Sequence, residues 1–197
     1  CGTPHPADRL TRAIVLLASV FSTGAFVCSF VLDGRFCLSR GFDVYDDEIE
    51  RDPAAPANLE AERPANEVVD RALRWLGQSD ARPFFAWVHL YDAHAPYAPP
   101  EPWLSRHAKV PYDGEIAFVD FQIGRIIEQL ERSGLRETTL IAIVADHGES
   151  LGEHGELTHG LLLYEPTLHV PLILNGPALS ARVVQALRRG RTAGSAG

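Results

Sequence analysis

Imidazole and carboxylate side chains follow two apolar runs of this sequence, shortly after each run ends. His94 follows the run Phe84 to Leu90, and Asp146 and His147 follow the run Thr138 to Ala145. Carboxylate oxygens and imidazole nitrogens are ligands of hard and borderline divalent cations. Asp146 and His147 are neighbours, so they can share one ion only where the chain turns out of a strand. The glycine that follows them permits such a turn.

Histidines are concentrated in this part of the chain. His154 and His159 lie just beyond His147, so four of the eight histidines fall within or just after the two clusters. A single surface histidine usually has no role in chemistry, and the concentration therefore carries more weight than any one residue. The acids nearby are expected to support these groups or to face solvent rather than to react: Glu149, Glu153 and Glu165.

The elements that must position these residues alternate between helix and strand. Apolar residues at three- and four-residue spacing predict a helix from Asn66, as its cap, to about Gln78, and a longer one from Asp113 to about Ser133. The two apolar runs above and a last run, Val170 to Leu174, have the length of strands. The β-branched run before Asp146 is typical of a strand covered on both faces.

This alternation predicts an α/β fold with a mostly parallel sheet and helices on both faces. Ligands of such sheets bind beyond the carboxyl ends of the strands. If the strands are parallel, the cluster at His94 and the cluster at Asp146 and His147 lie on one rim of the sheet. The sequence therefore predicts one polar site at that rim.

The N-terminal apolar segment admits two interpretations. No charged residue occurs from Ala13 to Leu32, which is long enough for a membrane span. Serine, threonine and glycine interrupt its middle, which favours a short helix from Arg9 to Val20 and a buried strand from Thr23 to Phe30. Membrane anchoring is therefore the less favoured interpretation, and it stays open.

Composition limits the remaining possibilities. One α/β domain is expected over residues 1–180, and the basic, small-residue tail 181–197 is typical of disorder. The formal charge of −8 argues against a nucleic-acid partner, because phosphate binding needs a basic surface. Cys28 is expected in the core, and the three widely spaced cysteines give no support to a disulfide framework or a zinc knuckle.

Several stretches together resemble the sulfatases of the alkaline phosphatase superfamily. They cover roughly Leu16 to Pro177 in the order and spacing of that family, although each motif alone is short. The resemblance implies that residues 1–180 are a fragment of a sulfatase N-terminal catalytic domain with an alkaline-phosphatase-like, truncated α/β fold. The stretches are GFDVYDDEI (41–49), WVHLYDAHAPYAPP (87–100), YDGEIAFVD (112–120), ADHGESLGEHGELTHG (145–160) and LYEPTLHVPLIL (163–174).

The resemblance implies a metal-dependent hydrolase of small-molecule or glycan sulfate esters. Asp146 and His147 match a pair of ligands to one divalent ion, for which calcium is favoured and manganese, magnesium or zinc are alternatives. His94 and His159 match residues that contact the anionic group of the ester, and they are the candidate catalytic residues. His94 is expected to protonate the leaving oxygen. His154 is a further candidate for substrate binding.

Two parts of the family's site have no counterpart in this sequence. The family nucleophile lies in a Cys/Ser-x-Pro-x-Arg motif, whereas the segment Cys1 to His5 has its proline one position late and lacks the arginine. The aspartate pair of the family's first strand is also missing, because Asp46 and Asp47 belong to a later block and are expected in a surface loop. The chain is therefore expected to be a fragment that is inactive by itself.

Two other functions stay open. An aspartate–histidine pair in place of aspartate–asparagine favours a phosphodiester or phosphonate monoester hydrolase of the same superfamily, whereas the surrounding loops resemble sulfatases. The alternative outside the enzymes is a non-catalytic remnant that binds a metal or an anion. Most relatives are exported, so the resemblance favours a periplasmic or extracellular location.

Overall fold

The computed structural model describes residues 20–50, 61–78, 82–160 and 163–177. They fall into two compact units, residues 1–127 and residues 128–197. The predicted helix from Arg9 to Val20 and the predicted tail 181–197 lie outside the described residues, apart from Val20. No described helix is long and apolar enough to cross a membrane.

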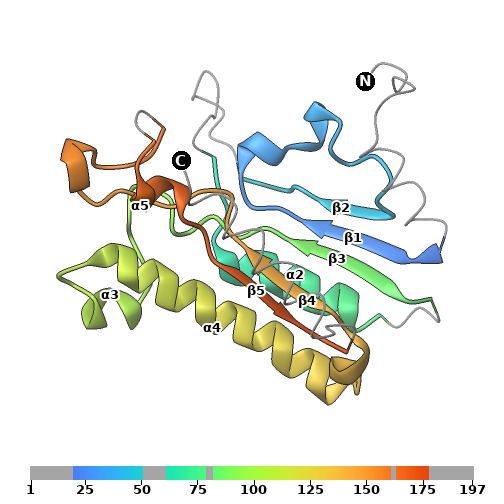
Figure 1. The fold of residues 1–197 in the computed structure, drawn as a ribbon. Helices are drawn as coiled ribbons and strands as arrows, with labels where there is room; N and C mark the ends of the chain where they lie inside the picture. The colour runs from blue at the N-terminus through green and yellow to red at the C-terminus, as the bar shows by residue number, and fades with distance from the viewer. Residues whose placement is uncertain (1–19, 51–60, 79–81, 161–162, 178–197) are drawn as a thin grey trace, which may run out of the picture. The chain divides into compact units, whose positions relative to one another are not determined.

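The first unit contains a parallel three-stranded sheet, as the sequence predicts. Its strands, in the order β2-β1-β3, are β1 (Ser22–Phe26), β2 (Val44–Asp46) and β3 (Phe84–Val88), and both neighbours of β1 run parallel to it. Gly24 is the Cα partner of Val44 in β2 and of Ala86 in β3. The three carboxyl ends therefore lie at one edge, and β3 leads from that edge into the His94 loop (Figure 1).

Helix α2 (Ala65–Leu76) packs against this sheet through a face of small and β-branched residues. Val68 and Ala72 are fully buried, and they form the core with Phe26 and Cys28. Cys28 is fully buried and therefore a core residue, as predicted, and this burial raises the pKa of its thiol. Burial of these apolar side chains stabilises the contact by about 1.5–3 kcal/mol for each larger residue.

The start of α2 corrects one prediction. Asn66 lies inside the helix and is not its cap, because the helix begins at Ala65 after Pro64. The amide of Ala65 donates instead to Oδ1 of Asp92 at 2.9 Å. A distant carboxylate therefore satisfies the first amide of the helix, which a local sequence pattern does not reveal.

Helix α4 (Pro111–Arg132) is the longest element and contains the boundary between the two units. It matches the predicted helix to within two residues at its start, and Gly134 follows it at a φ of +70°. The short helices are α3 (Trp103–Arg106), α5 (Glu165–Leu168) and the 3-10 helices η1 (Phe30–Leu32), η2 (Gly34–Phe36), η3 (Arg136–Thr138) and η4 (Glu153–Gly155).

The second unit contains a two-stranded antiparallel sheet. Strand β4 (Ile141–Val144) pairs with β5 (Leu172–Asn175), with Ile143 opposite Ile173. Both strands were predicted, but their antiparallel direction was not. The sequence predicts a strand that is covered on both faces. Val144 is 63% exposed, so the face of β4 that carries it is not covered within the described structure.

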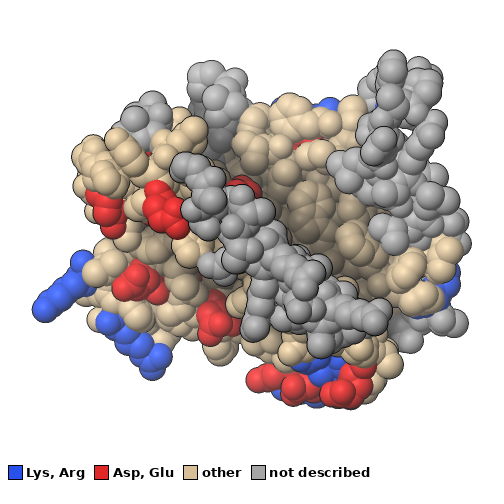
Figure 2. All heavy atoms as spheres, in the orientation of Figure 1, with Lys and Arg blue, Asp and Glu red and all other residues tan. Residues whose placement is uncertain are grey.

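The two cysteines of the described residues differ in their state. Cys28 is free and buried, whereas Cys37 is disulfide-bonded. Spacing alone gave no sign of this bond, because a disulfide joins residues that are close in space and not in sequence. The basic side chains in Figure 2 form small separate groups among the acidic ones, with no continuous basic surface on the part of the described chain that is in view.

Candidate active site

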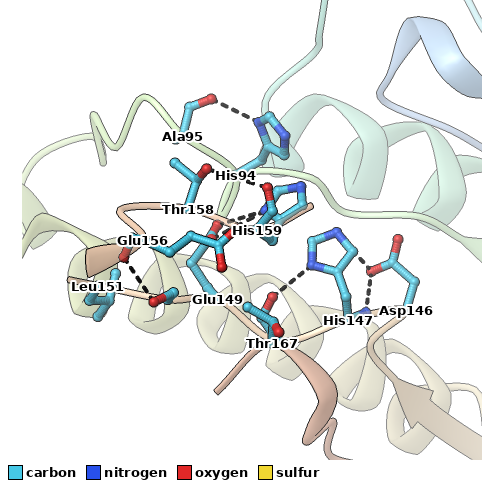
Figure 3. Close-up of polar contacts among 12 residues, drawn as sticks. His94, Ala95, Asp146, His147, Glu149, Leu151, Glu156, Thr158, His159 and Thr167 are labelled. Carbon is cyan, nitrogen blue, oxygen red and sulfur yellow. Dashed lines mark hydrogen bonds and ion pairs between the residues drawn. The ribbon is translucent and has the colours of Figure 1, made fainter. Parts of the chain in front are cut away.

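His94 lies in the first unit, in the loop that follows β3. Its amide donates to the carbonyl of Tyr91 at 2.9 Å, and its ring stacks on the Tyr91 ring with centroids 4.3 Å apart. Its Nδ1 lies 2.8 Å from the carbonyl oxygen of Ala95. A carbonyl oxygen only accepts hydrogen bonds, so Nδ1 carries the hydrogen and Nε2 is the basic nitrogen of the neutral ring. The loop therefore fixes both the plane and the tautomer of His94 (Figure 3).

Asp146 and His147 lie in the second unit, where the chain leaves β4. Oδ1 of Asp146 accepts the amide of His147 at 3.0 Å and lies 3.8 Å from Nε2 of the same residue. Nδ1 of His147 donates to the carbonyl of Gly148 at 2.7 Å, which leaves Nε2 as the basic nitrogen on the side of Asp146. A carboxylate oxygen and an imidazole nitrogen that can both ligate a metal ion therefore lie side by side. The Asp146 side chain is 84% exposed.

Gly148 is required here for space and not for an unusual backbone angle. A Cβ atom added at this position would lie 2.0 Å from the carbonyl oxygen of Pro166. The Gly148 amide donates to the carbonyl of Thr167 at 2.9 Å, so the turn after His147 is pressed against α5. The predicted turn is present, and close approach of two backbones explains the glycine.

His159 is held beside His147 by a buried carboxylate. Nδ1 of His159 lies 3.2 Å from each carboxylate oxygen of Glu149, whose side chain is 5% exposed. The rings of His147 and His159 lie 3.9 Å apart between centroids, at 30° to one another. Asp146, His147, Glu149 and His159 therefore form one cluster at the end of β4 (Figure 3). Glu149 belongs to it through its contact with His159.

His154 is arranged differently from the other three histidines. It adopts a left-handed backbone conformation with φ of +57° in η4, and its ring stacks on Tyr164 at 3.9 Å. Among the contacts that the structure gives, none joins His154 to Asp146, His147 or His159. A nearby acid, Glu153, accepts the amide of Leu151, which lowers the pKa of its exposed carboxyl.

The donor set at the end of β4 fits part of a divalent-ion site. Asp146 offers a carboxylate and His147 a basic imidazole nitrogen, both acceptable to calcium, manganese, magnesium or zinc to different degrees. No group of three or more histidine, cysteine, aspartate or glutamate side chains in the described residues has the arrangement of a metal site. Asp146 and His147 therefore supply two ligands, and a complete shell needs others.

Asp46 and Asp47 are engaged in structural contacts. Asp46 ends β2 and accepts from Arg63 at 2.6 Å and from Arg71 at 3.0 Å, while Oδ2 of Asp47 accepts the Gly34 amide at 2.7 Å. The surface-loop prediction is wrong for Asp46, because this residue lies in a strand with a side chain only 15% exposed. Neither aspartate takes the place of the missing nucleophile-side pair.

Sequence reasoning missed two acids of the first unit. Asp92 caps α2, and Glu115 in α4 accepts the amide of Ala98 in the loop after His94. Glu115 is 5% exposed, and burial raises its pKa to about 7. Asp92 is close in sequence to His94, which weakly indicates a role near the site. Glu115 is one of several polar residues of an amphipathic helix, and its sequence position does not distinguish it from the others.

Comparison with known proteins points to one family. The family model described as Sulfatase matches residues 16–191. Human iduronate 2-sulfatase is 32% identical over 99 residues, which cover 50% of this chain and 18% of that protein. The chain thus spans much less than two thirds of the length of this curated relative.

Solved structures share the fold. The phosphonate monoester hydrolase of Agrobacterium radiobacter matches with a TM-score of 0.62 at 20% identity, over 88% of this chain and 54% of that chain. A protein in complex with its substrate D-glucosamine-2-N,6-O-disulfate matches with a TM-score of 0.64 at 14% identity, over 89% of this chain and 57% of that chain. At these identities the likeness shows the α/β fold alone.

Proposed function

Because this chain belongs to the sulfatase family, whose model matches residues 16–191, we propose that it forms part of a metal-dependent hydrolase of sulfate esters. The observation that carries the proposal is the cluster of Asp146, His147, Glu149 and His159 at the end of β4. Asp146 and His147 are assigned to the metal, and His94 and His159 to the anionic group of the substrate. The metal of this proposal is calcium, with manganese, magnesium or zinc as alternatives.

A divalent ion on Asp146 and His147 would withdraw charge from the ester oxygens and lower the pKa of the attacking group. Nδ1 of His159 is hydrogen-bonded to the carboxylate of Glu149, so Nε2 of the same ring points away from that carboxylate. In the protonated ring both nitrogens donate, and Nε2 then holds an anionic oxygen of the ester. Glu149 fixes the ring, so little reorganisation is needed when the substrate binds.

His94 is proposed as the general acid for the leaving oxygen. Its Nδ1 is committed to the carbonyl of Ala95, so the proton that it transfers is carried on Nε2. Stacking on Tyr91 restricts rotation of the ring. The sequence contains no Cys/Ser-x-Pro-x-Arg motif, so none of its residues is assigned as the nucleophile. The chain alone is therefore proposed to lack turnover.

A sugar sulfate is the proposed substrate class. The support is the name of a relative, iduronate 2-sulfatase, and the disulfated glucosamine bound by one structural neighbour. A phosphonate monoester is the second candidate, favoured by the aspartate–histidine pair and by the phosphonate monoester hydrolase fold match. His154 is assigned to substrate binding only in the first case, as a contact outside the reacting group.

The test uses the protein expressed from the complete reading frame that encodes this chain. Calorimetric titration with calcium, after treatment with a chelator, is expected to give binding that Asp146→Ala and His147→Ala each weaken at least tenfold. Glu165→Ala is the matched control, because Glu165 is an exposed acid of the same unit. If Asp146→Ala binds calcium with unchanged affinity, the assignment of Asp146 as a metal ligand is wrong.

Turnover distinguishes the substrate classes. Aryl sulfate hydrolysis that exceeds aryl phosphonate hydrolysis supports the sulfatase proposal, and the reverse order supports the second candidate. If neither ester is hydrolysed by the complete protein with calcium, manganese, magnesium or zinc, both enzyme proposals fail. Calcium binding without turnover would then indicate the non-catalytic remnant.

A further inference from the structure

The loop that follows His94 is attached to α4 by a buried carboxylate. Oε1 of Glu115 accepts the amide of Ala98 at 2.8 Å, and Glu115 is only 5% exposed. Ala98 is four residues beyond His94 in the same loop. A side chain of the helix therefore reaches the backbone of the segment that carries the candidate general acid.

Neighbouring positions strengthen this attachment. A Cβ atom added to Gly114 would lie 2.7 Å from Cγ of Pro99, and Pro99 is fully buried. The ring of Tyr97 meets the ring of Tyr112 edge to face, with centroids 5.3 Å apart. Three successive loop residues thus contact the first turns of α4, and the amide of Ala98 is the polar contact among them.

The other end of the segment is held in a similar way. Asp92 accepts the amide of Ala65 at 2.9 Å and so attaches the start of the loop to α2. His94 lies between the two attachments, stacked on Tyr91 and bonded to the carbonyl of Ala95. Two carboxylates on either side of His94 therefore fix the loop to two different helices.

We propose that Glu115 is a positioning residue for His94, acting through the amide of Ala98 and the loop 95–99. The catalytic meaning of this role rests on the proposed function of His94, but the structural link does not. Glu115 needs only a carbonyl-type acceptor of the right length for this task. A neutral side chain of the same shape therefore suffices, and a side chain without the acceptor does not.

The charges around Glu115 agree with that requirement. Burial disfavours its ionised form most strongly, and the charges of Asp92 and Glu62 act in the same direction. The neutral carboxyl is thus an accessible form near neutral pH, and its carbonyl oxygen accepts from Ala98 as the carboxylate does. Glutamine at this position reproduces the neutral form.

Nuclear magnetic resonance on the whole chain tests the link without any need for turnover. Exchange of the Ala98 amide and the ring nitrogens of His94 are measured in the unaltered chain, Glu115→Gln and Glu115→Ala. In Glu115→Ala the Ala98 amide is expected to exchange at least tenfold faster, and His94 is expected to lose its single Nδ1–H tautomer. Glu115→Gln is expected to keep both signals.

Glu131→Ala is the matched control, because Glu131 is an exposed acid of the same helix. Unchanged Ala98 exchange or an unchanged His94 tautomer in Glu115→Ala overturns the proposal. If circular dichroism shows that Glu115→Ala does not fold, Glu115→Gln becomes the deciding variant. Fast exchange of the Ala98 amide in folded Glu115→Gln overturns the proposal, and slow exchange of that amide supports it. Failure of sulfate ester turnover in the complete protein would leave these signals unchanged, so the two proposals fail separately.

Discussion

The buried carboxylate of Glu149 holds Nδ1 of His159 at 3.2 Å from both of its oxygens. The two residues are ten positions apart and lie on opposite sides of the turn that contains η4. Because Glu149 is buried, its hydrogen bond with the ring lies in surroundings where such bonds are stronger than in water. This relationship gives His159 a fixed orientation beside His147.

Replacing Glu149 is expected to weaken substrate binding without removing any group that touches the substrate. Glu149→Gln keeps the volume and one acceptor oxygen but loses the charge, so it weakens the hydrogen bond that orients His159. We expect kcat/KM of the complete protein on an aryl sulfate to fall by about 10- to 100-fold, the range found for residues that orient site groups. Steady-state kinetics measure this change.

An exposed pair in the same unit provides the control. Glu165 lies 3.3 Å from Nδ1 of His169, and both side chains are largely exposed. Glu165→Gln removes a similar glutamate–histidine contact away from the cluster, and surface pairs of this kind contribute little. Equal losses in Glu149→Gln and Glu165→Gln would contradict a specific role for Glu149.

Gly148→Ala is expected to disturb the turn that carries Asp146 and His147. The new Cβ atom would meet the carbonyl oxygen of Pro166 at 2.0 Å, so backbone must move. We expect a loss of about 1–3 kcal/mol in the free energy of unfolding, measured by urea titration. Calcium affinity of the complete protein is expected to fall with it.

Gly124→Ala is the matched change. A Cβ atom added to Gly124 meets nothing within 4 Å in the middle of α4. Alanine is the better helix former, so this variant is expected to gain about 1 kcal/mol. If Gly148→Ala is as stable as the unaltered chain, the close approach to Pro166 is not important.

Much of the fold was predictable because local patterns determine it. The helix around Asp113 to Ser133 repeats apolar residues at regular spacing, the strand at Phe84 is a short continuous apolar run, and both are present. The parallel pairing of β1 with β3 agrees with the alternation of helix and strand, whereas β2 and its place in the sheet were not predicted. The antiparallel pairing of β4 with β5 did not follow, because direction depends on how the long segment between Val144 and Leu172 returns.

The candidate site was predictable in part for the same reason. Asp146 and His147 are adjacent in sequence at the end of an apolar run, so their closeness is local. The contact of Glu149 with His159 and that of Glu115 with Ala98 join residues that no periodicity relates. Such contacts become visible only when the chain is folded.

Asp46 is expected to be needed for stability rather than chemistry. Arg63 is 3% exposed, and Asp46 is the carboxylate that pairs with it at 2.6 Å. Asp46→Ala would leave a buried cation without this partner, which costs about 3–5 kcal/mol. Urea titration of the whole chain measures the loss.

Glu48→Ala is the comparison for that variant. Glu48 pairs with Arg71 at 2.6 Å, but its side chain is largely exposed. Removal of an exposed pair is expected to cost less than about 1 kcal/mol. Similar losses in Asp46→Ala and Glu48→Ala would show that the buried pair is not special.

The last prediction concerns the pH dependence of stability that Glu115 produces. Burial, with help from Asp92 and Glu62, raises the pKa of Glu115 from the usual 4.5 to about 7 in the folded chain. A raised carboxyl pKa means that folding favours the protonated form. The contribution of Glu115 to stability is therefore fully present below pH 4.5 and is lost as the pH rises to about 7.

The free energy of unfolding is expected to decline by up to about 3 kcal/mol over that range because of this one group. Glu115→Gln cannot ionise, so its stability relative to the unaltered chain is expected to rise between pH 4.5 and 7 and to level off above. Urea titrations at several pH values measure the free energy of unfolding of both proteins. The contributions of the other titrating groups cancel in the difference between Glu115→Gln and the unaltered chain. Glu131→Gln, on the exposed side of the same helix, is the matched control for the loss of one carboxyl group. A constant difference between Glu115→Gln and the unaltered chain would mean that Glu115 ionises in the folded protein as freely as in the unfolded one.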